Sequence, residues 1–194
     1  MAGIEAAKRI RFMVPNALIT MISKESLLHW SRPALMYIFM GELKYKDTIP
    51  YPEEWFTQKR ITLRQVEVKH IDRAEKYLTC ADGTIIAYDV LLIATGSKPR
   101  SLNIPGVELE GVTGLYHLQD LQKLESLAPQ LNRAVVVGGG LIGVELAEML
   151  LHRHTSVTMV TQDPFFAAHL FPQDEAEFLS NYLRELGVDL RLST

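Results

Sequence analysis

The chain has very little cysteine. Cys80 is the only one among 194 residues, which excludes an intramolecular disulfide and any redox or metal motif built on paired cysteines. We expect no metal site, and we expect a reducing, cytoplasmic location. No activating His or second Cys is adjacent to Cys80, so we expect a small buried side chain there rather than a catalytic thiol.

Concentrated charge and long apolar runs are also missing. The formal net charge is −3 and no block of Lys or Arg accumulates, so we expect no nucleic-acid partner. No apolar run is long enough to cross a bilayer and the N-terminus lacks a signal-peptide pattern, so we expect no membrane partner. Hydrophobic residues make up 47% of the chain, which is enough for a buried core in one large domain or two small ones.

A glycine motif at mid-chain gives the strongest functional indication. Gly138, Gly140 and Gly143 have the spacing G-x-G-x-x-G directly after the apolar run 134–137. The first glycine permits a sharp turn out of a strand, the second leaves room for a pyrophosphate, and the third lets helix and strand pack closely. We predict a buried strand, a tight turn and a helix whose N–H groups face a dinucleotide. The alternatives are a packing turn, or a related fold that binds another nucleotide-containing ligand.

The beginning of the chain is similar to this motif. Residues 3–7, Gly-Ile-Glu-Ala-Ala, match residues 143–147, Gly-Val-Glu-Leu-Ala, and residues 18–22 match residues 156–160. We therefore predict two copies of one unit. In the second copy a strand and two glycines precede the matching segment, whereas in the first copy they would fall before Met1. We interpret the sequence as beginning within a phosphate-binding loop; the alternative is a plain N-terminal helix with chance similarity.

The region between the two copies predicts short elements. We expect strands at 66–68, 77–78 and 85–86, with an Asp-Gly turn at 82–83. The apolar run 88–93 predicts a buried strand that ends in small residues, where a ligand can approach the backbone.

An acidic side chain follows the first predicted strand. Glu25 lies just after residues 18–22, where a carboxylate can accept hydrogen bonds from an adenosine ribose. A solvated loop charge is the alternative. Short helices are expected near Ala34 and from Pro52.

The second half begins with a linker and ends with a helix and a strand. Residues 101–114 form the expected linker, because Pro and Gly recur there. Asp174 and Glu177 have capping-box spacing at the start of a helix. Gly187 is expected to end that helix.

These features together resemble the pyridine nucleotide–disulfide oxidoreductase family of flavoproteins with two dinucleotide-binding domains. The residues that resemble it are Leu-Ile-Ala-Thr-Gly-Ser-Lys-Pro-Arg at 92–100, the glycine fingerprint at 138–147 and the tandem arrangement; Ser-Arg-Pro-Ala-Leu at 31–35 resembles the branch of NADH-dependent rubredoxin, ferredoxin and nitrite reductases. The resemblance implies an α/β chain with two incomplete Rossmann-like domains and a short antiparallel meander. Residues 1–105 would be part of an FAD-binding domain and residues 115–194 the first half of an NAD(P)H-binding domain.

The resemblance also implies roles for individual residues. In such enzymes NAD(P)H passes hydride to FAD, and the electrons go on to a small redox protein or another acceptor. Glu145 would lie near the contact between nicotinamide and flavin, as the candidate catalytic residue. The FAD-lining residues would be Gly3, Glu25, Arg32, Pro33, Val68, Ala94, Thr95 and Gly96, and the NAD(P)H-binding residues would be Gly138, Gly140, Leu141, Ile142, Gly143 and Thr161.

Several departures from the family pattern limit which reaction and which coenzyme we expect. No cysteine pair exists for dithiol chemistry, and no cysteine lies near residues 37–40, where a peroxidase or water-forming oxidase of this family would have one. Thr161 stands where a ribose-binding Glu is common, so NADH and NADPH both stay open. The alternative to an enzyme is a truncated, non-catalytic nucleotide-binding module, or a subunit whose sheet is completed by another chain.

Overall fold

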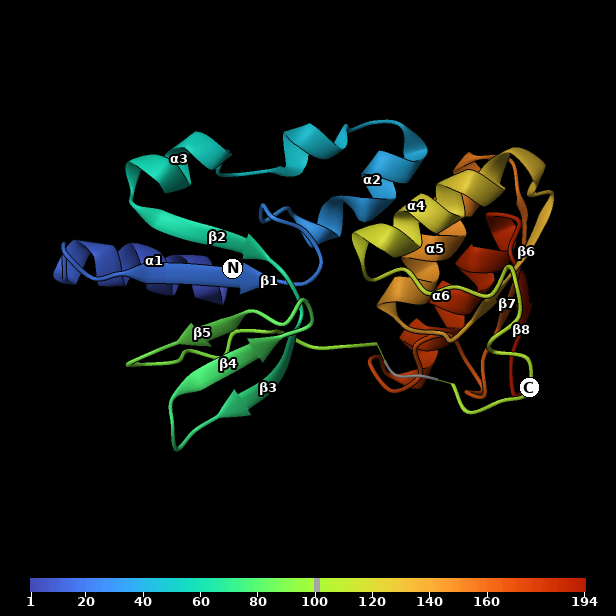
Figure 1. The fold of residues 1–194 in the computed structure, drawn as a ribbon. Coiled ribbons are helices and arrows are strands. Elements are labelled where there is room, and N and C mark those ends of the chain that lie inside the picture. Colours follow the sequence, from blue (N-terminus) through green and yellow to red (C-terminus); the bar gives the residue numbers. More distant parts are fainter. Residues whose placement is uncertain (100–101) are drawn as a thin grey trace. The chain divides into compact units, whose positions relative to one another are not determined.

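The computed structural model describes residues 1–99 and 102–194, which form two compact units (Figure 1). Unit 1 contains Met1–Ser31 and the described residues from Tyr45 to the gap; unit 2 contains Arg32–Lys44 and the described residues after the gap. Arg100 and Ser101, which end the predicted FAD segment and begin the predicted linker, lie outside the described residues. Both units combine helices with parallel strands, so the chain is α/β as predicted.

Unit 1 has a small core beneath two parallel strands. Helix α1 (Ala2–Met13) precedes strand β1 (Ile19–Ser23), and after the 3₁₀ turn η2 (Tyr45–Thr48) and helix α3 (Glu53–Gln58) comes strand β2 (Ile61–Gln65). Strands β1 and β2 pair in parallel from Ile19↔Ile61 to Ser23↔Gln65. The buried core residues are Ile4, Ala7, Phe56 and Ile61. Ile4 and Ala7 are three residues apart on one face of α1, which is the face that the core covers.

The predicted antiparallel meander is confirmed, although its first strand begins at Val68 and not at Val66 as predicted. Its strands are β3 (Val68–Asp72), β4 (Tyr77–Cys80) and β5 (Ile85–Ala87), in the order β3-β4-β5. The turn between the last two strands uses Gly83 at φ +83°, with the Thr84 N–H donating to Asp82 Oδ1 at 2.9 Å. Cys80 is buried in β4 with 3% of its surface exposed, as predicted for a small apolar side chain.

The predicted buried strand at 88–93 is wrong. This segment has no strand structure, and Val90, Leu92 and Ile93 are 89%, 58% and 64% exposed. An apolar run forms a strand only when a neighbouring strand satisfies its backbone N–H and C=O groups. Within the described part of unit 1 no strand pairs with this segment, so it is part of no sheet.

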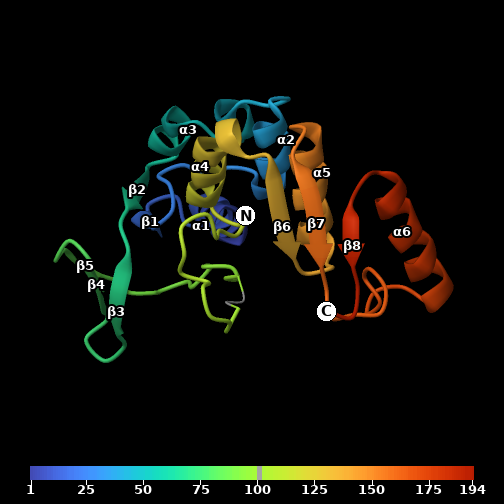
Figure 2. The ribbon, with the colours of Figure 1, turned by 90° about the vertical axis from the view of Figure 1, so that its right-hand side faces the viewer.

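Unit 2 is built around a parallel sheet in the order β6-β7-β8. The sheet consists of β6 (Arg133–Val137), β7 (Ser156–Val160) and β8 (Asp189–Arg191), linked through helices α5 (Leu141–His152) and α6 (Gln173–Glu185). Because both crossovers step the same way along the sheet, right-handed connections place α5 and α6 on the same face (Figure 2). Helix α5 packs on β6 and β7, and α6 packs on β8.

Strand β6 is buried on one face only, so the prediction of a buried strand is right for that face and wrong for the other. Val136 is 5% exposed, whereas Val135 and Val137 are 67% and 55% exposed. Side chains alternate between the two faces of a strand, and α5 covers only one of them.

Further short helices complete unit 2. They are η1 (Arg32–Ala34), α2 (Leu35–Met40), α4 (Leu118–Leu127) and η3 (Ala128–Gln130). Helix α2 contacts α4 and α5, and the Arg153 guanidinium at the end of α5 donates to the Phe39 carbonyl. Residues 32–44, which the resemblance assigns to the FAD-binding part, thus pack in unit 2. The domain boundaries implied by the resemblance stay a prediction.

The helix ends differ in part from expectation. Helix α6 begins at Gln173 with Pro172 at its N-cap and without a side-chain cap, so the predicted capping box at Asp174 and Glu177 is wrong. Asp174 lies inside the first turn, where its negative charge interacts favourably with the helix dipole, but it is not at the N-cap position. Gly187, at φ +94°, follows Leu186, the C-cap of this helix, and the helix ends there as predicted.

A capping box is present at the start of α4 instead. There the Asp120 carboxylate accepts hydrogen bonds from the N–H groups of Tyr116 and His117 at 2.9 and 2.8 Å. None of the helices in the described ranges is long and apolar enough to cross a bilayer.

Candidate functional site

The glycine motif forms the turn between β6 and α5. Gly138 follows β6 in a left-handed conformation, φ +117°, and its N–H donates to the Val160 carbonyl at 2.9 Å. Gly140 is the N-cap of α5 in extended conformation, and its carbonyl accepts the Val144 N–H at 3.2 Å. The predicted order of strand, tight turn and helix is confirmed.

Two glycines of the motif have opposite surroundings. A Cβ on Gly143 would lie closer than 3.0 Å to the Gly138 carbonyl oxygen, which real Cβ atoms do not tolerate. A Cβ on Gly140 would meet no atom within 4 Å. Gly143 is therefore required by the close packing of helix on turn, whereas Gly140 faces open space. A ligand that approaches the start of α5 can use that space.

The first turn of α5 presents donors to this space. Leu141 and Ile142 are 65% and 50% exposed, and Glu145 is also exposed. The first N–H groups of any α-helix have no partner inside the helix, and its dipole adds a partial positive charge at that end. This end of α5 fits a pyrophosphate, because the first helix N–H groups lie there and Gly140 has no side chain that would fill the space in front of them.

A second loop, residues 161–171, borders the glycine turn. Thr161 follows β7 and is 5% exposed, and its Oγ1 would lie 3.1 Å from a Cβ on Gly139. The Ala167 N–H donates to the Gly139 carbonyl at 3.2 Å, with Ala167 in the left-handed region at φ +54°. The loop 161–171 is thus attached to the turn.

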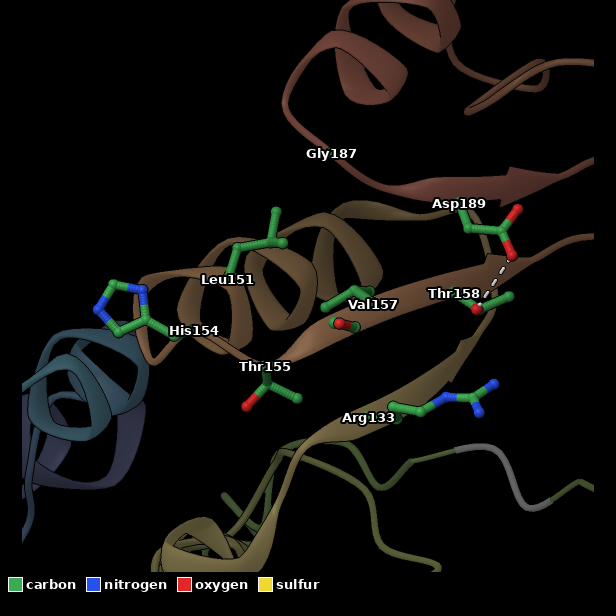
Figure 3. A pocket seen from close by; sticks show the side chains of 9 residues that line it. Arg133, Leu151, His154, Thr155, Val157, Thr158, Gly187 and Asp189 are labelled. Atoms are coloured by element: carbon green, nitrogen blue, oxygen red, sulfur yellow. Dashed lines mark hydrogen bonds between the residues drawn. The ribbon is translucent and has the colours of Figure 1, made fainter.

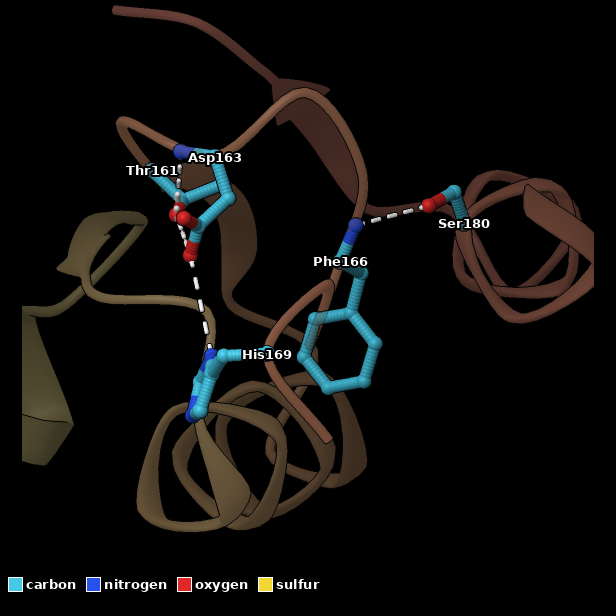
Figure 4. Close-up of polar contacts among 5 residues, drawn as sticks. All are labelled: Thr161, Asp163, Phe166, His169 and Ser180. Atoms are coloured by element: carbon cyan, nitrogen blue, oxygen red, sulfur yellow. Dashed lines mark hydrogen bonds and ion pairs between the residues drawn. The ribbon is translucent and has the colours of Figure 1, made fainter. Parts of the chain in front are cut away.

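Asp163 is a polar residue of this loop that the sequence analysis did not identify. The Thr161 hydroxyl donates to Asp163 Oδ2 at 3.4 Å and accepts from the Asp163 N–H at 3.3 Å, and His169 Nδ1 lies 3.9 Å from the same carboxylate (Figure 4). The predicted site includes Thr161 of this loop but not Asp163. An acidic residue about 20 residues beyond the glycines was the available signal.

The predicted FAD-lining residues of unit 1 are brought together only in part. A Cβ on Gly3, in α1, would lie 3.5 Å from Ala94 Cβ, so these two residues are neighbours. Thr95 and Gly96 follow in the exposed segment, with Gly96 at φ +70°. Val68 begins β3 beside Cys80.

Glu25, Arg32 and Pro33 have separate surroundings. The Glu25 carbonyl accepts the Gln65 side-chain amide at 3.3 Å. Arg32 and Pro33 belong to η1 in unit 2, where the Arg32 guanidinium donates to the Tyr116 carbonyl and lies 4.4 Å from the centre of the Tyr116 ring.

A cavity of about 500 Å³ lies at the other end of the sheet in unit 2 (Figure 3). Arg133, Ser156 and Asp189, the first residues of β6, β7 and β8, line it, whereas the glycine turn follows the carboxyl end of β6. A hydrogen bond from Arg191, and a weaker one from Thr158, hold the pKa of the exposed Asp189 carboxyl below its usual value. None of the predicted site residues lines this cavity.

The family model that matches this chain is named for oxidoreductases, and two curated proteins that match it are named as reductases. The family described as pyridine nucleotide-disulphide oxidoreductase matches residues 1–194. A probable ferredoxin reductase from Castellaniella defragrans is 32% identical over 97% of the chain and 46% of its own length. A rubredoxin-NAD(+) reductase from Pseudomonas putida is 30% identical over 99% and 50%.

A solved structure shows the same fold. The ferredoxin reductase of Rhodopseudomonas palustris superimposes with a TM-score of 0.89 at 26% identity, over 99% of this chain and 48% of that one. The chain therefore spans about half the length of the proteins it matches. With the family matched along its whole length and the glycine turn in place, the chain belongs to the pyridine nucleotide-disulphide oxidoreductase family.

Proposed function

We propose that this chain is part of an FAD-dependent NAD(P)H oxidoreductase. The bound cofactors would supply the chemistry, with hydride passing from NAD(P)H to FAD and electrons going on to an acceptor. The contribution of the protein is to bind and orient them. The family match supports this reading, since relatives are named as ferredoxin and rubredoxin reductases.

The observation that carries the proposal is the contrast within the glycine turn. Gly143 has no room for a side chain, whereas Gly140 has open space before it. A turn that served packing alone would require the first property but not the second. Gly138, Gly140, Leu141, Ile142 and Gly143 would hold the pyrophosphate through backbone N–H groups, Thr161 would border the ribose, and Glu145 would lie on the nicotinamide side.

The flavin side of the proposal is supported by a contact within unit 1. A Cβ on Gly3 would lie 3.5 Å from the Ala94 Cβ, so helix α1 borders the segment of small residues where FAD is expected. We assign FAD to residues 1–105 and NAD(P)H to residues 115–194. The FAD-lining set would be Gly3, Glu25, Arg32, Pro33, Val68, Ala94, Thr95 and Gly96.

The electron acceptor would be a small redox protein or a small molecule. The names of the relatives, which pair such reductases with ferredoxin and rubredoxin, support a small redox protein. A cytoplasmic location is part of the proposal, supported by the single buried cysteine.

A flavin titration tests this function. The purified chain is incubated with FAD, passed through a desalting column and scanned between about 350 and 500 nm, where protein-bound flavin absorbs. We expect a retained flavin spectrum that NADH bleaches in the absence of oxygen. A spectrum that is not retained, together with measurable binding of ADP-ribose, would instead indicate the non-catalytic nucleotide-binding module.

A further inference from the structure

The loop between α1 and β1 exposes a group of apolar side chains. Phe12, Met13 and Val14, at the end of α1, are 76%, 64% and 54% exposed, and Leu18, directly before β1, is fully exposed. We call these four residues the apolar tip. Asn16 is the one polar side chain between residues 12 and 18. Because apolar surface is unfavourable in water, a group of this kind indicates an interaction site.

Two arginines hold the loop in one shape. The Arg11 guanidinium donates to the carbonyl oxygens of Lys59 and Arg60 at 2.8 and 2.7 Å. Arg11 and Arg60 both donate to the Pro15 carbonyl, at 2.7 and 2.8 Å. These bonds join the loop to the turn between α3 and β2, at the same end of unit 1 (Figure 1). A loop that is already fixed loses little conformational freedom when it binds a surface.

The surroundings of the apolar tip are strongly basic. Residues 8–18 and 57–62 contain five Lys and Arg and no Asp or Glu, although the whole chain has a net charge of −3. Lys8 is paired with Glu5 at 2.8 Å. The other four form no ion pair with a described residue: Arg9, Arg11, Lys59 and Arg60. The carbonyl oxygens that bond Arg11 and Arg60 satisfy their N–H groups without cancelling their charge, so the loop has an excess of positive charge.

We propose that the apolar tip and these four cations attach the protein to the surface of a bilayer that contains anionic lipids. Reversible binding of this kind combines apolar side chains that enter the headgroup region with Lys and Arg that are attracted to the lipid phosphates. The expectation of no membrane partner rests on the lack of a long apolar run, and attachment to a bilayer surface needs no such run. The inference does not depend on the flavin reaction.

The composition of the apolar tip favours a lipid surface over an acidic protein. Leu and Val are under-represented among the residues that dominate binding between proteins, and the tip has no Trp or Tyr, which are enriched there. Phe and Leu are typical of the side chains that enter a bilayer interface. A fluid surface also adapts to separate side chains on a loop, whereas a protein partner would need a shaped pocket for them.

Flotation of the purified chain with lipid vesicles tests the inference. Vesicles of phosphatidylcholine with about 30% phosphatidylserine supply the anionic surface. In a sucrose gradient, bound protein rises with the vesicles, whereas aggregated protein sinks. We expect binding about tenfold or more stronger than to vesicles of phosphatidylcholine alone. This binding should weaken at high salt, because salt screens the four cations.

Single substitutions separate the apolar and the charged contributions. Phe12→Asn should weaken binding to the anionic vesicles about tenfold, because its ring no longer enters the bilayer. Phe178→Asn is the matched control: it makes the same change at a 71% exposed position on α6 and should leave binding unchanged. Lys59→Gln should weaken binding about fivefold. Lys123→Gln, at an exposed position on α4, should have no effect.

Three results would overturn the inference. The first is no binding to the anionic vesicles, or equal binding to both vesicle compositions. The second is full binding by a Phe12→Asn variant whose circular dichroism is unchanged. The third is binding to poly-L-glutamate but not to the vesicles, which would indicate an acidic protein partner instead. The comparison of the two vesicle compositions uses the unaltered chain, so it decides the matter even if a variant does not fold, and the flavin titration tests the proposed function separately.

Discussion

Exchanging two glycines of one turn for alanine should produce opposite effects. In Gly143→Ala the new methyl group would meet the Gly138 carbonyl oxygen at less than 3.0 Å. Both atoms belong to backbone held by the helix and the strand, so no flexible side chain can yield. To restore ordinary contact, the start of α5 must move from the turn by about 1 Å.

The expected magnitude follows from the cost of overpacking. Forcing a methyl group into a rigid backbone contact costs about 1–3 kcal/mol of unfolding free energy, and we expect the upper part of that range because the obstacle is a carbonyl. Gly140→Ala, by contrast, adds a methyl group with no atom within 4 Å, at a residue without positive φ. Its cost should be about 0.5 kcal/mol or less, because alanine is a poorer N-cap than glycine.

Urea unfolding followed by far-ultraviolet circular dichroism measures the stability of each variant, and calorimetry measures its affinity for ADP-ribose. Gly143→Ala should lower the unfolding midpoint, whereas Gly140→Ala should keep the midpoint and lose affinity, since its methyl group occupies ligand space. Equal midpoints in the two variants would refute the packing role of Gly143. Full affinity in Gly140→Ala would show that the ligand does not approach this turn.

Two further predictions concern single aspartates. Asp120→Ala removes the acceptor for the His117 and Tyr116 N–H groups and should lower the unfolding free energy by about 1 kcal/mol, whereas Asp174→Ala, which caps nothing, should cost less than half as much; equal urea midpoints would contradict this. In Asp72, hydrogen bonds from the backbone N–H groups of Glu75 and Ala74 lower the pKa of the carboxyl from its usual 3.8. Because the bonded form is charged, its stabilisation is complete above the usual value and is lost as pH falls through the lowered one. Carboxyl-carbon NMR titration should therefore give Asp72 a midpoint below 3.8. An unshifted midpoint would mean that the N–H groups of Ala74 and Glu75 do not bond the Asp72 carboxylate in solution.

Sequence patterns predicted the elements whose cause is local. The glycine spacing fixed the turn after β6, because a left-handed Gly138 and a crowded Gly143 are demanded by a few neighbouring atoms. The Asp-Gly pair at 82–83 similarly specified the turn between β4 and β5. In each case the deciding contacts lie within a few residues of the motif.

Features that depend on distant partners were not predictable in this way. The run 88–93 is apolar enough for a strand, but a strand also needs a neighbour that composition does not reveal. The exposed face of β6 depends on which helix covers the sheet. Asp163 itself can be found in the sequence by its distance from the glycines, but its bonds to the Thr161 hydroxyl and to the Ser193 N–H cannot.

The bond between Ala167 and Gly139 has a consequence for engineering. Ala167 is 1% exposed and has φ +54°, a backbone shape that favours glycine. Its N–H donates to the Gly139 carbonyl and so joins the loop 161–171, which follows β7, to the glycine turn, which follows β6. If only the segment with the G-x-G-x-x-G motif were moved into another protein, the hydrogen bond from Ala167 would be lost. A design that is meant to keep the shape of the turn therefore has to include the loop 161–171 as well.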